Sequence, residues 1–217
     1  QCVRRCTAIH TTKFQAISNT IVADAYFAKK KFIDCLQNID LQLISRFRKD
    51  ADLMYLYGGK PSKKQGRPKK YDGKVDFKNI DKKHFKLFLE EGSTQYYTAI
   101  IYAKTFKRNL KVVLEITKNK NKTSHFLYFS TDLEIDALKI LQAYKKRFRI
   151  EFLFRDAKQH TSLQNCQARS INKLHFHFNA SLTSINIAQI FYLMNDAKLK
   201  TKTFSMANIK TLYNNKL

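Results

Sequence analysis

The sequence lacks an apolar run of the roughly 18 to 20 residues that a membrane-spanning helix requires, and it shows no secretory signal peptide. Its longest candidate, Leu182 to Met194, is interrupted by Asn186 and Gln189 and predicts a buried helix instead. Acidic residues are scarce, 17 against 41 Lys and Arg, and none stands before Asp24. We therefore expect a strongly basic protein with no membrane as its partner.

Cysteine is also scarce. The four cysteines are scattered along the chain, at positions Cys2, Cys6, Cys35 and Cys166. Cys2 and Cys6 have no partner pair at zinc-ligand spacing, so the sequence offers no structural zinc site. This usage indicates a reduced protein of the cytoplasm.

The excess of basic residues gives a formal net charge of +24. A polyanion is the natural partner for such a charge, because neutralised phosphates release their counterions. A ribosomal or generic RNA-binding protein would carry the same charge, and an anionic membrane surface is a weaker alternative. The hydrophobic content of 44%, with 17 Phe and 11 Tyr, is sufficient for a sizeable core and excludes a mere basic tail.

Four ionisable residues recur at helical spacing, at offsets of 0, 3, 7 and 14: Tyr144, Arg147, Glu151 and Lys158. On a helix they fall within roughly 60° of one another. Large apolar residues border this stripe, namely Phe148, Ile150, Phe152 and Phe154, and the opposite side carries solvent-type residues, namely Lys145, Lys146, Arg149 and Asp156. Unpaired charges that face an interior are costly, so the stripe predicts a site whose metal ion and phosphate come from outside the chain. The alternative is an ordinary solvated face with an Arg147–Glu151 pair.

The spacing Tyr-x2-Arg-x3-Glu-x6-Lys resembles the signature of one branch of the DDE insertion-sequence transposases, the family numbered four. The resemblance implies that Glu151 is the third catalytic carboxylate and a metal ligand. It also implies that Tyr144, Arg147 and Lys158 hold DNA phosphates near the cleaved end.

Asp24 is the candidate for a second carboxylate. It follows a short apolar strand, Thr20 to Ala23, and precedes a helical pattern over Ala25 to Gln37. From the residues alone, an N-cap of that helix is favoured over a metal ligand. In the family that the chain resembles, the second catalytic Asp is followed by a Tyr-containing helix and by a strand that leads into Arg-x-Arg, as Leu41 to Arg48 does here. The resemblance therefore makes Asp24 a catalytic residue and metal ligand.

The first catalytic Asp has no counterpart. DDE enzymes resemble ribonuclease H, with that Asp on the first, central strand, but only 23 residues precede Asp24 and none is acidic. We expect the C-terminal part of a transposase, with an α/β fold in which an incomplete RNase H-like catalytic core is interrupted by a β-rich insertion. Two carboxylates are a deficient site for two divalent ions, so this chain alone is expected to be inactive.

Three domains are expected. Residues 1–50 would form the partial RNase H-like core, residues 51–132 the β-rich insertion, and residues 133–217 the catalytic helix and the C-terminal helices. Strands are expected over four ranges of the insertion: Leu53 to Tyr57, Tyr96 to Phe106, Leu110 to Thr117 and Ser124 to Ser130. A helix over Lys173 to Met194 is expected to pack against the catalytic helix.

Within the insertion, Lys60 to Lys70 holds six basic residues and no acid. Pro61, Gly66 and Pro68 rule out a regular element, so we expect an exposed cationic loop. Its candidate DNA-binding residues are Lys63, Lys64, Arg67, Lys69 and Lys70. A loop that follows phosphates is one interpretation, and a merely solvated charge run is the other.

The resemblance therefore implies a transposase of an insertion sequence, which is expected to cleave DNA at transposon ends and to join it to a target. The resemblance implies two Mg²⁺ or Mn²⁺ ions in the complete enzyme, double-stranded DNA as partner (terminal repeats and target), a homodimer on DNA, and a nucleoid-associated location in the cytoplasm of a bacterial-type cell. A non-catalytic DNA- or RNA-binding protein and a hydrolytic RNase H-like nuclease remain as alternatives.

Overall fold

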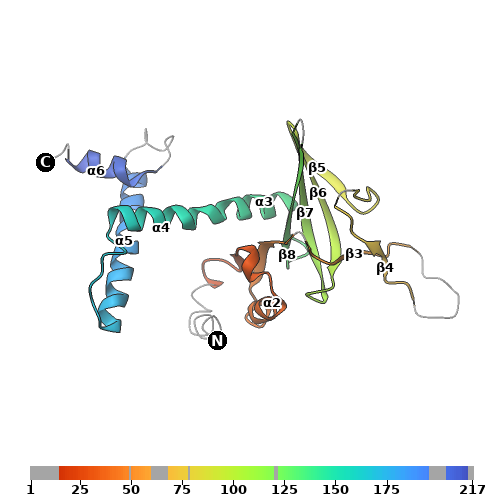
Figure 1. Cartoon of the computed structure of the whole chain (residues 1–217), viewed down its shortest axis with the longest axis horizontal. Helices are drawn as coiled ribbons and strands as arrows, with labels where there is room; N and C mark the ends of the chain where they lie inside the picture. Colours follow the sequence, from red (N-terminus) through yellow and green to blue (C-terminus); the bar gives the residue numbers. More distant parts are fainter. Residues whose placement is uncertain are drawn as a thin grey trace. The chain divides into compact units, whose positions relative to one another are not determined.

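The fold is seen in a computed structural model, which describes residues 15–48, 50–59, 68–77, 79–119, 122–195 and 204–214. Contacts divide the chain into two compact units, residues 1–147 and 148–217. The first unit contains a mixed sheet with helices, and the second contains helices alone within its described residues (Figure 1). The fold is therefore α/β.

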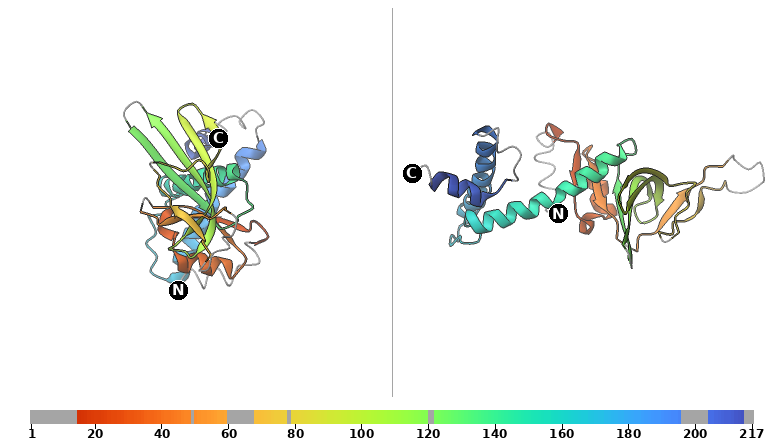
Figure 2. Two further views of the ribbon diagram at one scale, coloured as in Figure 1. Left: turned by 90° about the vertical axis from the view of Figure 1, so that its right-hand side faces the viewer. Right: turned by 90° about the horizontal axis from the view of Figure 1, so that it is seen from above.

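The strands of the first unit are β1 (Thr20–Val22), β2 (Gln42–Arg46), β3 (Leu53–Leu56), β4 (Tyr71–Lys74), β5 (Lys86–Glu91), β6 (Thr94–Ala103), β7 (Arg108–Asn119) and β8 (Lys122–Ser130). They form one sheet in the order β1-β2-β8-β7-β6-β3-β4, and β5 also pairs with β6. β1 and β2 are parallel, whereas the other pairs are antiparallel. The long strands β6, β7 and β8 are strongly twisted (Figure 2), as open sheets generally are.

The helices of the first unit are η1 (Ala25–Phe27), α2 (Lys30–Gln37), α3 (Ala137–Lys145) and the 3-10 turn η2 (Lys146–Phe148), at which the unit ends. The second unit contains α4 (Arg149–His160), α5 (Ile171–Asn195) and α6 (Met206–Asn214). No helix of the described residues is both long enough and apolar enough to cross a bilayer.

The sheet is covered on both faces, which explains why its central strands are nearly continuous apolar runs. Alternate residues of each strand point to opposite faces. One face packs on α2 through Ile33 and Leu36, and the other packs on α3 through Ile140 and Leu141. The sheet therefore fixes α2 and α3 on opposite sides of the strands that carry the candidate site.

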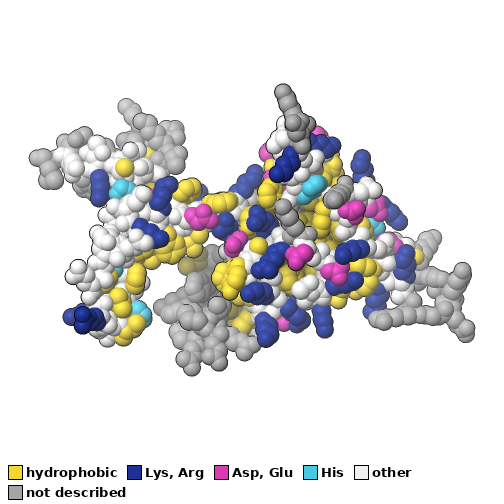
Figure 3. Space-filling view, viewed as in Figure 1, with side chains coloured by type: hydrophobic (Ala, Val, Ile, Leu, Met, Phe, Trp, Pro, Cys, Tyr) yellow, Lys and Arg dark blue, Asp and Glu magenta, His cyan; other side chains and the backbone are white. Residues whose placement is uncertain are grey.

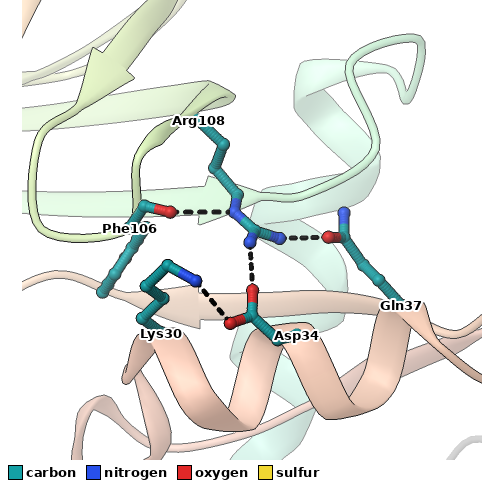
Figure 4. Close-up of polar contacts among 5 residues, drawn as sticks. All are labelled: Lys30, Asp34, Gln37, Phe106 and Arg108. Carbon is teal, nitrogen blue, oxygen red and sulfur yellow. Dashed lines mark hydrogen bonds and ion pairs between the residues drawn. The ribbon is translucent and has the colours of Figure 1, made fainter.

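A polar clamp fixes α2 to the sheet (Figure 4). Arg108, at the start of β7, donates hydrogen bonds to the side chains of Asp34 and Gln37 and, through Nε, to the carbonyl oxygen of Phe106 at 3.2 Å. Lys30 donates to the second oxygen of Asp34 at 2.6 Å. The hydrogen bond from Lys30, followed by that from Arg108, holds the pKa of Asp34 below its usual range. The β-rich segment thus holds the helix that follows Asp24.

The strands expected from the sequence are present, with small shifts of their ends. The helix expected over Ala25 to Gln37 is present as η1 and α2, separated by Ala28 and Lys29. β8 pairs with β2 in the same sheet, Arg46 opposite Tyr128, so the β-rich segment continues the sheet of the first residues. Whether residues 51–132 are an insertion into a ribonuclease H-like core is a question of family architecture and remains a proposal.

Two expectations for the second unit were wrong. The apolar helix over Leu182 to Met194 lies within α5, but it is not buried all round, since Ile187 is 61% and Met194 is 80% exposed. Asp156, expected on a solvent face, is buried on α4 and accepts hydrogen bonds from Arg155 at 3.1 and 3.2 Å. The expected packing of α4 on α5 is confirmed, through a small core that joins Ala157, Leu163, Ile185 and Met206.

Candidate active site

Asp24 lies at the carboxyl end of β1, as the sequence predicts. The amide of Ala23 donates to the carbonyl oxygen of Ile44 at 3.0 Å, which continues the pairing with β2 to the end of the strand. Asp24 occupies the N-cap position of η1, but its side chain makes no capping hydrogen bond, and it is exposed. The N-cap interpretation therefore does not explain the carboxylate, which is left accessible at the strand end.

The parallel pairing of β1 and β2 brings a cation to the same edge. Val22 lies opposite Ile44 in the register, so Asp24 and Arg46 each follow two residues beyond this pair. Parallel strands end at one edge of a sheet, and side chains that follow them gather there. From the sequence, Arg46 was expected only as part of the strand Leu41 to Arg48, which ends in Arg-x-Arg.

Tyr144 comes to this edge from α3, the helix that covers the sheet face. Its ring packs on that of Tyr128 with centroids 4.9 Å apart, and the guanidinium of Arg147 lies 5.8 Å from the centre of the Tyr144 ring. Burial raises the pKa of the Tyr144 phenol, and so does the charge of Asp24, whereas Arg46 and Arg147 act in the opposite direction. Asp24, Arg46 and Arg147 are thus the charged groups that act on this phenol.

Tyr128 and Glu115 support Tyr144 from the sheet. The Tyr128 hydroxyl donates a hydrogen bond to Glu115 Oε2 at 3.0 Å. Burial raises the pKa of Tyr128 well above its usual range, and the neighbouring Glu115 carboxylate adds to the effect. Neither Tyr128 nor Glu115 was predicted from the sequence. The register of β2 and β8 places Tyr128 opposite Arg46, and Glu115 joins the site through its hydrogen bond with Tyr128.

The four residues of the expected helical stripe are divided between three elements. Tyr144 is in α3, Arg147 is in η2, and Glu151 and Lys158 are on α4 of the second unit. The expected single helix is interrupted by the 3-10 turn, whose tighter winding changes the angular offset between the two halves. Glu151 and Lys158 are exposed and stand seven positions apart on α4.

The apolar border of this stripe is not covered as expected. Its four members are 42 to 53% exposed: Phe148, Ile150, Phe152 and Phe154. The guanidinium of Arg155 lies 4.9 Å from the centre of the Phe152 ring. The expectation that these side chains would enclose an ionisable stripe was therefore wrong for the described residues.

The carboxylates of the described residues do not by themselves fit a two-metal centre. No three His, Cys, Asp or Glu side chains gather as metal ligands in the part of the chain that the structure describes. Asp24, Arg46 and Arg147 all act on the pKa of the Tyr144 phenol. A phenol and a guanidinium are donors that suit a phosphate better than a cation. The edge thus combines one exposed carboxylate, Asp24, with a phenol and basic side chains.

The structure describes only the last three residues of the basic loop, 68–70. Lys63, Lys64 and Arg67 lie outside the described residues. Lys69 forms an ion pair with Asp72 at 3.0 Å and lies 5.2 Å from the centre of the Tyr57 ring. Lys70 is exposed immediately before β4, and its carbonyl oxygen accepts a hydrogen bond from the amide of Tyr57 at 3.0 Å. The loop thus connects the antiparallel strands β3 and β4.

Basic side chains are distributed over the surface of the sheet unit (Figure 3), as the net charge of +24 requires. The chain was also compared with known protein families. The family model described as "Transposase DDE domain group 1" matches residues 1–214. No curated protein matches the chain significantly.

Proposed function

The chain belongs to the transposase DDE domain family, and on that premise we propose that it is part of an insertion-sequence transposase of the family-four branch. The reaction would be cleavage of DNA at transposon ends and transfer of the cleaved strand to a target. A single observation supports the proposal: an exposed carboxylate, Asp24, follows a strand end and acts on the Tyr144 phenol together with Arg46 and Arg147.

In this proposal Arg147 and Tyr144 hold DNA phosphates at the reacting end. A guanidinium presents a planar set of donors that matches two phosphate oxygens at once. The Tyr144 phenol is kept protonated by burial, which raises its pKa, so it can donate a hydrogen bond to a phosphate oxygen at physiological pH. Lys158, on α4, would add a point charge to the same strand.

Asp24 and Glu151 are proposed as the catalytic carboxylates. The complete enzyme would bind two Mg²⁺ or Mn²⁺ ions, which in such sites activate a water or a 3′-hydroxyl and stabilise the leaving oxygen. Two carboxylates are too few for that centre, so the proposal requires a third carboxylate, the first Asp of the family, in addition to Asp24 and Glu151.

The proposed partner is double-stranded DNA, both transposon terminal repeats and target, bound by a homodimer in the nucleoid. The basic loop would contribute Lys63, Lys64, Arg67, Lys69 and Lys70 as phosphate contacts. The proposed architecture is a partial ribonuclease H-like core in residues 1–50, an insertion in residues 51–132, and the catalytic helix and C-terminal helices in residues 133–217.

A second candidate is a non-catalytic DNA- or RNA-binding protein, which the lack of a three-ligand group among the described residues favours. Such a protein would keep a steep salt dependence of affinity and would lose nothing when Glu151 is neutralised. A hydrolytic nuclease, by contrast, would cut strands without joining them and would show no preference for terminal repeats.

The test uses the complete protein that carries this sequence, with a duplex that contains the transposon end. Glu151→Gln is expected to abolish cleavage and to leave DNA affinity within about twofold, because the change removes a carboxylate without removing a phosphate contact. Glu134 is another exposed acidic residue, outside the proposed site. The Glu134→Gln variant should therefore cleave DNA at the wild-type rate. Cleavage that survives Glu151→Gln would contradict the assignment.

A further inference from the structure

One residue of β4 lies outside the ladder that pairs this strand with β3. Tyr55 of β3 lies opposite Gly73. The next residue of β3, Leu56, lies opposite Tyr71, which leaves Asp72 as the extra residue of a β-bulge. Gly73 has a φ of +127°, a value that favours glycine. Bulges re-aim a side chain and recur beside functional sites, but the roles proposed so far do not use this carboxylate.

The carboxylate of Asp72 contacts both ends of the basic loop, Lys60 to Lys70. Lys69, near the end of the loop, forms an ion pair with Asp72 Oδ1 at 3.0 Å. The amide of Gly58, which precedes the loop, donates a hydrogen bond to the same carboxylate. The hydrogen bond from Lys69, with a smaller contribution from the Gly58 amide, holds the pKa of Asp72 below its usual range. One charged group therefore joins the two ends of the loop.

A third segment of the chain reaches the second oxygen of Asp72. His84, just before β5, has its Nε2 3.4 Å from Asp72 Oδ2 and 3.7 Å from Asp81 Oδ2. The His84 ring stacks on that of Tyr55 with centroids 4.6 Å apart, which fixes the ring against the sheet. A lone ion pair on a surface contributes little. The Asp72 side chain, by contrast, is only 15% exposed and connects three segments.

We propose that Asp72 is a positioning residue for DNA binding, which holds the two ends of the basic loop together. The inference rests on the proposed function, since it takes the loop as a phosphate contact. A loop whose ends are fixed loses less conformational entropy when it binds, so its affinity is higher. The acidic residue thereby strengthens binding to a polyanion. This effect is opposite in sign to the direct repulsion between a carboxylate and phosphates.

The sign of the effect on DNA affinity distinguishes positioning from charge. Fluorescence anisotropy measures binding of the full chain to a labelled duplex. Asp72→Asn keeps the size of the side chain and removes its charge, and it should weaken binding roughly 2- to 10-fold, which corresponds to the ordering of one flexible side chain. Asp52→Asn is the matched control, because Asp52 pairs with Lys74 and Lys104 at 3.6 and 3.3 Å, at the other end of β3. This control should bind as tightly as the wild type or more tightly.

A second pair of variants tests the bulge without changing any charge. Gly73→Ala places a side chain at a φ of +127°, so it should displace Asp72 and weaken DNA binding in the same direction as Asp72→Asn. Gly92→Ala is the matched control, since Gly92 also has a positive φ, +57°, between β5 and β6. This control should bind as the wild type does. Asp72→Glu keeps the carboxylate and should retain most of the affinity.

Hydrogen exchange with mass spectrometry examines the loop ends in the absence of DNA. The amide of Tyr57 donates to the carbonyl oxygen of Lys70 at 3.0 Å, across the two ends of the loop. Exchange at Tyr57 should be faster in Asp72→Asn and in Gly73→Ala, and unchanged in both control variants. Thermal melting by circular dichroism checks that each variant is folded.

DNA binding by Asp72→Asn that equals or exceeds that of the wild type would overturn the inference, and so would unchanged exchange at Tyr57. If Asp72→Asn does not fold, Gly73→Ala decides by the same two measurements. Failure of the wild-type chain to bind the duplex would contradict the proposed function itself. Binding by the wild type that Asp72→Asn does not weaken would leave the proposed function standing and remove only the role of Asp72.

Discussion

Among single residues, the proposed phosphate contact of Tyr144 depends on whether its phenol is protonated. Burial raises the pKa of Tyr55, Tyr96, Tyr128 and Tyr144. A phenol with a raised pKa remains a hydrogen-bond donor throughout the physiological range. The hydroxyl of Tyr128 donates a hydrogen bond to Glu115. The hydroxyl of Tyr144 is proposed to donate one to a DNA phosphate.

The raised phenol pKa values predict how stability depends on pH. Below pH 10 the phenols are protonated in both the folded and the unfolded chain, so their contribution to the free energy of unfolding is fully present. Above about pH 10 the unfolded chain releases phenolic protons that the folded chain keeps, so stability falls as the pH rises. Urea unfolding between about pH 8 and 11 measures this fall.

Lysines titrate in the same range, so the comparison with Tyr128→Phe isolates one phenol. The variant is expected to lose less stability than the wild type over the same pH interval, because it lacks the phenol whose pKa is raised by burial and by Glu115. Equal slopes in the two proteins would contradict the described environment of Tyr128.

At the scale of secondary-structure elements, the site depends on where β1, β2 and α3 end. β1 and β2 deliver Asp24 and Arg46 to one edge through their parallel register, and α3 delivers Tyr144 to the same place. α2, which follows Asp24, is fixed to β7 by the Arg108 clamp. The positions of the site residues are thus set by pairings between segments far apart in sequence.

The clamp predicts a local change in the dynamics of α2. Arg108→Ala removes the hydrogen bonds to Asp34 and Gln37, so the amides of Lys30–Gln37 should exchange with solvent faster, as hydrogen exchange with mass spectrometry measures. Lys104→Ala is the matched control, since Lys104 pairs with Asp52 at 3.3 Å away from α2. Unchanged exchange in Arg108→Ala would show that apolar packing alone holds the helix.

The sequence was sufficient to predict the local elements and insufficient to predict their assembly. Alternating or continuous apolar runs placed β1, β2, β3, β6, β7 and β8, and helical spacing placed α2 and α5. β4 and β5 were missed, because neither Tyr71–Lys74 nor Lys86–Glu91 is a strongly apolar run. The 3-10 turn η2 was missed as well, since nothing in the spacing of ionisable residues marks it.

The prediction from residue spacing of which α4 side chains are buried was also wrong. Periodicity identifies which residues share a face, but the choice of the face that is covered depends on the partner helices. In the second unit α5 and α6 cover Ala157 and leave Phe152 exposed, so Asp156 is buried beside the covered face. The Arg46–Tyr128 contact was out of reach for a similar reason, since 81 residues lie between the two positions in the chain and only the strand register joins them.

At the scale of the whole molecule, the net charge of +24 predicts the salt dependence of DNA binding. A protein that neutralises six to ten phosphates loses roughly 10³- to 10⁵-fold in affinity between about 50 and 200 mM salt. We expect a loss in this range for a duplex of any sequence, and Lys70→Gln should reduce the log–log slope by about one. Anisotropy titrations at several salt concentrations provide the slope, and a shallow slope would contradict phosphate-dominated binding.

Under the proposed function, Asp24 and Glu151 act as one catalytic unit on DNA. The most direct measurement is the single-turnover rate of strand cleavage by the complete protein with Asp24→Asn, with Glu151→Gln and with both. Each single change is expected to slow cleavage by roughly 10³-fold or more, and the double change should cost no more than the worse single one, because residues that act as a unit are not additive. Cleavage that survives either change, or losses that multiply in the double variant, would contradict the claim.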